Sequence, residues 1–181
     1  MEQLYILMLV ILFALAITDL VVGVSNDAVN FLNSAIGSKV FPLRTILIVA
    51  SLGVAVGAIF SSGLMEVARE GIFNPGEFLF EEIMIIFMAV MITDIILLDF
   101  FNSMGLPTST TVSIVFELLG AAVCVAFLKI YTSSGDLGTL LNYINTSTAT
   151  QIVVGILLSV IIAFTLGSII QYFSRLIFSF Q

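Results

Sequence analysis

The chain of 181 residues contains no histidine, no tryptophan, three prolines and a single cysteine. Without histidine, the usual zinc sites and histidine-based acid–base catalysis are excluded. The lone Cys124 lies in an apolar run, so an internal disulfide and a thiolate metal cluster are excluded as well. No nucleophile–base pair is evident either, and we therefore expect a protein that is not an enzyme and needs no cofactor.

Charged residues are also scarce, at 9% of the chain, and only five of them are basic. The formal net charge is −7. Five basic residues in an acidic chain cannot form the positive surface that binds a phosphate backbone. Nucleic acid is therefore excluded as a partner.

Apolar residues dominate instead, at 60% of the chain, with a mean hydropathy of +1.25. This composition is typical of an all-α polytopic membrane protein, with the lipid bilayer as its surroundings. We expect a single transmembrane domain over residues 1–181, located in the cell membrane. Its expected spans are residues 4–24, 43–64, 78–101, 112–130 and 149–173.

The basic residues predict an orientation. Lys39 and Arg44 flank the first connection and place it in the cytoplasm, so the N-terminus is expected outside. Five crossings then leave Arg175 inside, in agreement, whereas Lys129 falls at the outer end of the fourth run and disagrees.

The first polar segment is GVSNDAVN, residues 23–30, which interrupts the first apolar run. Amide, hydroxyl and carboxylate side chains are costly in hydrocarbon and are tolerated mainly where they line a cavity or meet a ligand. We predict a broken first helix that supplies half of an ion and anion site.

The second polar segment is GLPTSTT, residues 105–111. Gly105 and Pro107 end the preceding helix, and the hydroxyl side chains open the next one. Free N–H groups at a helix N-terminus, together with hydroxyl donors, form a site for an oxyanion. A simple helix cap by Ser109 would explain one hydroxyl, but four in succession exceed what one cap requires. The flanking runs could be two full spans or a re-entrant hairpin, and bringing the turn beside Asp27 favours the hairpin.

Several further acids lie within or at the ends of apolar runs, with no basic residue deep in any run to neutralise them. Carboxylates in a low-dielectric medium must be protonated, bind a cation or face water. Each could instead be a protonated acid bonded to a neighbouring helix, or an interfacial residue. These acids are Asp19, Asp94, Asp99 and Glu117, the last three being secondary candidates for a Na⁺ or proton site.

The two polar segments are chemically complementary. An oxyanion beside Asp27 would be repelled unless a cation lay between them, so each ligand needs the other. This dependence is the physical basis of symport.

Both segments resemble the two signatures of the inorganic phosphate transporter (PiT) family, glycine-x-asparagine-aspartate and glycine-leucine-proline-x-serine-threonine-threonine. The resemblance implies Na⁺- or H⁺-coupled symport of inorganic phosphate. It assigns the cation to Asn26, Asp27 and Asn30. It assigns phosphate to Asp27, Asn30, Ser109, Thr110 and Thr111.

Members of that family carry two such halves as inverted repeats and commonly form dimers, so the resemblance implies a chain that is one half of a transporter. Either the chain is an N-terminal fragment whose second half is missing, or two copies pair; we favour the fragment. An uncoupled channel and a sulfate carrier are the alternative functions. Val112 stands where the family often has histidine, and this difference affects the identity of the coupling ion.

Overall fold

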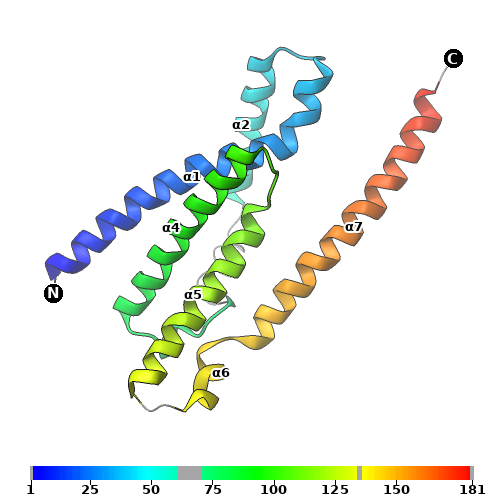
Figure 1. Ribbon diagram of the computed structural model, residues 1–181. Helices are drawn as coiled ribbons and strands as arrows, with labels where there is room; N and C mark the ends of the chain where they lie inside the picture. Colours follow the sequence, from blue (N-terminus) through cyan, green and yellow to red (C-terminus); the bar gives the residue numbers. More distant parts are fainter. Residues whose placement is uncertain (1, 61–70, 134–135, 180–181) are drawn as a thin grey trace. The chain divides into compact units, whose positions relative to one another are not determined.

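The computed structural model describes residues 2–60, 71–133 and 136–179 (Figure 1). Contacts divide the chain into two compact units, Met1–Asn145 and Thr146–Gln181, which we describe separately. Within the described residues there are helices and one isolated bridge, Phe73 to Ile144, but no β-strand. The prediction of an all-α protein is confirmed, while the single domain over residues 1–181 stays a prediction.

Five long helices follow the five apolar runs, and four of them are long and apolar enough to cross a membrane. The protein is thus a multi-pass membrane protein. The second helix is shorter, and residues 61–64 of its expected run lie outside the described residues, as do the first residues of the following loop. The long helices are α1 (Glu2–Ser38), α2 (Leu43–Ile59), α4 (Phe80–Met104), α5 (Thr110–Ser133) and α7 (Thr146–Phe178). The short ones are η2 (Pro75–Glu77), η3 (Leu137–Thr139) and α6 (Leu140–Tyr143).

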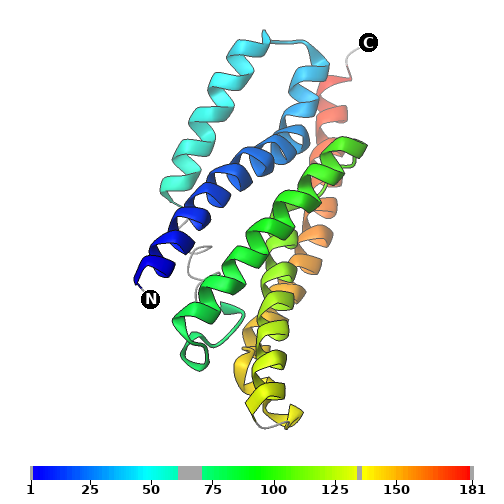
Figure 2. The same cartoon turned by 60° about the vertical axis from the view of Figure 1, so that its left-hand side comes forward.

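The predicted break in the first helix is wrong. Helix α1 is continuous over 37 residues, which corresponds to about 55 Å. The polar segment bends the helix without ending it, since the axis changes direction in the second half of α1 (Figure 2). Ser25 Oγ donates to the Val21 carbonyl at 2.8 Å, and this kind of bond within a helix often accompanies a bend. Its hydroxyl is thereby satisfied inside the helix, so no break is needed.

Helices α1 and α4 lie side by side and run in the same direction (Figures 1 and 2). Tyr5 hydrogen-bonds to Glu81, and Asn26 hydrogen-bonds to Asn102. The two contacts are 21 residues apart on each helix, so α1 and α4 are parallel and stay in register between them. Helix α5 returns antiparallel to α4 after a short turn. The three helices share a core of buried aliphatic side chains, which includes Ile86, Leu98, Leu118, Ala122 and Ala126.

The far end of this unit, which we call the base, is closed by residues 72–82 and 142–145 together with Lys129. Ile72 and Phe73 are each 1% exposed, and the Asn74 N–H donates to the Tyr143 carbonyl at 2.9 Å. Lys129 Nζ donates to Glu82 Oε2 at 2.8 Å and to the Glu77 carbonyl at 2.9 Å. The basic residue that disagreed with the predicted orientation is therefore ion-paired.

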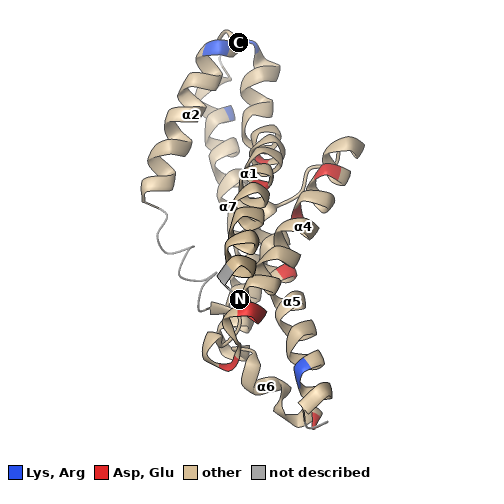
Figure 3. Ribbon diagram, turned by 90° about the vertical axis from the view of Figure 1, so that its left-hand side faces the viewer, with Lys and Arg blue, Asp and Glu red and all other residues tan. Residues whose placement is uncertain are grey.

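The charged residues of the first unit are unevenly placed (Figure 3). Lys39 and Arg44 lie at the connection between α1 and α2, whereas Lys129 is ion-paired at the base. Acids lie along the helices between these regions. The predicted orientation, with the N-terminus outside, stays a prediction.

Candidate functional site

The turn between α4 and α5 is built by its own sequence. Gly105 ends α4 in the left-handed conformation, with φ +66°, which glycine adopts without a steric penalty. The Leu106 N–H donates to the Phe101 carbonyl at 3.0 Å and satisfies one carbonyl of the last helical turn. Pro107 then keeps the chain extended until α5 begins at Thr110. The predicted interruption between residues 105 and 111 is confirmed.

This turn contacts the polar segment of α1. Thr110 Oγ1 lies 3.1 Å from both carboxylate oxygens of Asp27 and donates to that carboxylate. Thr110 occupies the first position of α5, where free N–H groups and the helix dipole favour an anion. Asp27 therefore lies beside the hydroxyl segment, as expected if the two segments complement each other.

Two asparagines of α1 also bond across to the hairpin. Asn30 Nδ2 donates to the Thr108 carbonyl at 2.9 Å, and Asn26 Nδ2 donates to Asn102 Oδ1 at 2.9 Å. Asn26 is 2% exposed, yet its Oδ1 has no hydrogen-bond partner among the described residues. We call this region the hairpin end: residues 26–30 of α1 with residues 102–111.

The other hydroxyl residues take different positions. Ser109 Oγ accepts from the Val112 N–H at 3.4 Å, so Ser109 caps α5, which is the simpler explanation considered for it. Thr111 is exposed and is the second residue of α5. Both are next to Thr110 in the chain, but only Thr110 bonds to Asp27 in the part of the chain that the structure describes.

Of the secondary acids, two are drawn into the helix interface and one is not. Asp94 is 1% exposed and contacts Asp19, whereas Asp99 is exposed. Glu117 Oε1 accepts from Ser113 Oγ at 2.7 Å, one turn away on α5. These acids lie farther along the helices, toward the base, and not at the hairpin end.

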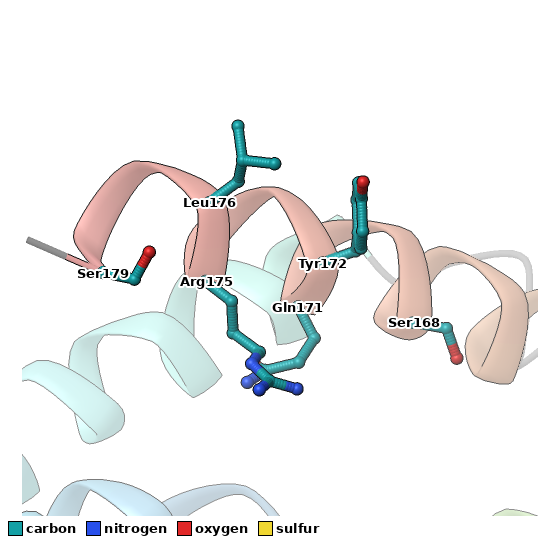
Figure 4. Close-up of a pocket in the computed structure, with 6 residues that line it drawn as sticks. All are labelled: Ser168, Gln171, Tyr172, Arg175, Leu176 and Ser179. Atoms are coloured by element: carbon teal, nitrogen blue, oxygen red, sulfur yellow. The ribbon is translucent and has the colours of Figure 1, made fainter.

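Two hollows in the described part of the chain contain none of the predicted site residues. One lies along the end of α7, where the side chains of Gln171 and Arg175 point to one side and Tyr172 and Leu176 to another (Figure 4). A second, of about 430 Å³, lies between α1 and α2 and is lined almost entirely by apolar side chains such as Phe31 and Ile46. The hairpin end is distinguished by the hydrogen bonds that join α1 to residues 102–111.

Residues 23–180 match the family described as the phosphate transporter family. The chain belongs to this family. The match begins within α1, at residue 23, and covers both polar segments and every later helix. Membership confirms the family resemblance of the two signatures, and because the family consists of transporters, the expectation that the chain is not an enzyme is confirmed.

Two mycobacterial relatives of this chain are each named "Putative phosphate permease", one from Mycobacterium bovis and one from Mycobacterium tuberculosis. Each is 29% identical over 155 residues, which is 81% of this chain and 26% of the relative. The chain thus spans about a quarter of the length of these relatives. No solved structure matches it.

The sequence did not single out three participants at these contacts: Asn102, the Thr108 carbonyl and Ser113. Asn102 was visible as an amide three residues before the second signature. Its partner could be found only from the parallel arrangement of α1 and α4, which the sequence does not specify.

Proposed function

We propose that this chain forms part of a carrier that moves inorganic phosphate across the membrane together with a cation, either Na⁺ or H⁺. The observation that carries the proposal is the contact between Thr110 and Asp27, because it joins the two signature segments of a phosphate transporter family at one place. A hydroxyl donor and a carboxylate then face the same small volume.

The chemistry of this contact explains why two ligands are needed. The N-terminus of α5 and its hydroxyls suit an oxyanion, and in this structure Asp27 is the anion beside Thr110. A phosphate arriving there meets a like charge, which a cation bound between them would offset. We assign the cation to Asn26, Asp27 and Asn30, whose oxygens suit a hard cation. Phosphate would be held by Asp27, Asn30, Ser109, Thr110 and Thr111.

The contact between Asn30 and Thr108 bears on how deep the turn between α4 and α5 lies in the membrane. Asn30 bonds the turn at Thr108, and α1 continues to Ser38, about 12 Å farther. This difference supports a re-entrant hairpin. The lengths of α4 and α5, 25 and 24 residues, would equally suit two full spans.

The remaining assignments concern the whole transporter. The chain spans about a quarter of its named relatives, so a second half, or a second copy of this chain, would complete the pathway. We propose a homodimer in the cell membrane, with inverted repeats and the N-terminus outside.

The test is uptake of radiolabelled phosphate into proteoliposomes that contain the purified protein. Saturable uptake that rises under an inward Na⁺ or proton gradient, but not under a K⁺ gradient, is the expected result. Phosphate-independent ion conductance without gradient-driven uptake would instead identify a channel. Equal uptake of labelled sulfate would overturn the assignment of phosphate as the substrate.

A further inference from the structure

Three carboxyl side chains from three different helices lie near one another in the first unit, one of them buried and two half-buried. Asp19 comes from α1, Asp94 from α4 and Glu117 from α5. Asp19 and Asp94 contact each other side chain to side chain, and Glu117 lies within electrostatic range of both. We call these three residues the carboxyl cluster. It lies about 12 Å along α1 from Asp27, too far for the two groups to share one ligand.

The oxygens of this cluster lack donors. Asp19 Oδ1, Asp94 Oδ1 and Glu117 Oε2 are buried without a hydrogen-bond partner in the described part of the chain. One of the cluster's oxygens, Glu117 Oε1, receives a bond, from Ser113. Ionised carboxylates only accept hydrogen bonds, so two of them in contact repel each other and satisfy none of their lone pairs.

A second buried group in the same helix interface also lacks a hydrogen-bond donor among the described residues. Asn26, two turns along α1 from Asp19, is 2% exposed and its Oδ1 is also unpartnered. The interface of α1, α4 and α5 therefore presents acceptors from all three helices with too few donors. Adding protons to the carboxyls supplies donors and removes charge in one step.

Protons fit this cluster better than a metal ion. Among the residues that the structure describes, no three His, Cys, Asp or Glu side chains are arranged to hold a metal. The ion pair of the described chain is Lys129 with Glu82, at the base, so no cation among the described residues pairs with the cluster. The remaining charged groups of the packed helices lie away from it: Arg44 at the start of α2, Asp27 at the hairpin end, Asp99 on the exposed side of α4, and Glu81 at the base.

We propose that Asp19 and Asp94 share a bound proton at neutral pH, with Glu117 as the third carboxyl of a proton-binding site that is separate from the site at Asp27. The proton bonds the two aspartates to each other across α1 and α4. Its release raises the charge of the pair from −1 to −2, and the repulsion between the two carboxylates weakens the contact of the helices.

Infrared spectroscopy of the purified protein in detergent, without phosphate, tests this directly. The wild-type protein is expected to show the carbonyl band of a protonated carboxylic acid at neutral pH. Asp94→Asn should remove that band, whereas Asp99→Asn, on an exposed residue of the same helix, should retain it. Absence of the band in the wild-type protein, or its full retention in both Asp94→Asn and Asp19→Asn, overturns the proposal.

Thermal unfolding gives a second readout that does not depend on transport. A proton held in the folded state and released on unfolding makes the wild-type protein less stable as the pH rises from about 4, where an unfolded aspartate ionises, to the pH at which the folded protein releases the proton. Asp94→Asn resembles the protonated acid in shape, so it should fold and show a smaller fall in melting temperature over the same pH range. An equal fall in both proteins contradicts a proton site at Asp94.

This result is separable from the proposed function. Loss of the infrared signal would remove the proton site and leave phosphate binding at Asp27 and Thr110 untouched. Retention of the signal, with no effect of added phosphate on melting temperature and no uptake, would keep the proton site and remove the carrier.

Discussion

The two ends of the α1–α4–α5 bundle use polar side chains in different ways. At the base, Lys129 Nζ donates to the Glu82 carboxylate and to the Glu77 carbonyl. It also lies 5.9 Å from the ring centroid of Phe78 and 5.8 Å from that of Tyr143. At the hairpin end, the Thr110 hydroxyl lies within hydrogen-bond distance of both carboxylate oxygens of Asp27. The Oδ1 of buried Asn26 has no hydrogen-bond partner among the described residues. The polar side chains at the base find their partners within the protein, whereas at the hairpin end a buried acceptor lacks one among the described residues.

This difference separates structural from functional polar groups. A buried polar group with a full set of partners stabilises the fold, while one without partners is retained against a free-energy penalty of about 1–3 kcal/mol. Such a penalty is expected where a ligand completes the set. Changes at the hairpin end should thus affect transport, and changes at the base should affect stability.

The largest effect is expected for Asp27→Asn. The amide keeps an acceptor for Thr110 but cannot hold a cation against an incoming anion, so gradient-driven phosphate uptake should fall by about 100-fold or more. Uptake into proteoliposomes measures this. Asp99→Asn, which removes an exposed carboxylate from α4, is the matched control and should leave uptake near the wild-type rate. Normal transport by Asp27→Asn would remove this residue from the mechanism.

A smaller effect is expected when the hydroxyls are removed. Ser109→Ala combined with Thr110→Val deletes two hydroxyls at the start of α5, including the donor to Asp27. A hydrogen bond to a charged group contributes about 1.5–3 kcal/mol, so the phosphate concentration for half-saturation should rise at least roughly tenfold.

The control for this pair is Thr93→Val. Its hydroxyl donates to the Ala89 carbonyl at 2.8 Å within α4 and lies on an exposed face. Half-saturation should not change in this variant. An unchanged value in the double variant as well would show that these hydroxyls do not hold the anion.

How much of this the sequence predicted depends on whether a feature is local. The turn at Gly105 and Pro107 was predictable, because both residues restrict the backbone where they stand. The continuity of α1 was not, because Ser25 satisfies its hydroxyl within the helix, and composition does not reveal that bond. Convergence of residues 23–30 and 105–111 was inferred from chemistry, and the structure places Asp27 against Thr110.

The contact of Asp19 with Asp94 could not be predicted in the same way. It depends on the parallel register of α1 and α4, in which residues far apart in the chain contact each other, such as Tyr5 with Glu81 and Asn26 with Asn102. A pattern of acids along one sequence does not give that register. The assigned roles of the site residues stay predictions.

At the base, Lys129→Met should lower stability without affecting phosphate affinity. The variant loses an ion pair whose side chains are 27% and 20% exposed, together with a bond to a carbonyl. After allowance for solvent screening, the expected loss is roughly 1 kcal/mol, measured as a lower melting temperature in detergent. Lys39→Met, at an exposed residue, is the control and should change the melting temperature little. A raised half-saturation concentration in Lys129→Met would contradict the separation of the two ends.

The smallest effect, and one of defined sign, is expected from a pair of glycine substitutions. Both Gly105 and Gly120 have open space where a Cβ would lie, so neither substitution creates a clash. Gly105 has φ +66°, which places its added Cβ in a strained backbone and should destabilise the protein by about 1 kcal/mol. Gly120 lies inside α5, where alanine should stabilise it by about 0.5–1 kcal/mol. Melting temperatures that move in opposite directions would confirm that the turn is held by its backbone conformation. A shift in the same direction for both would show that α4 does not end at Gly105 as described, and the position of Thr110 beside Asp27 would then need another cause.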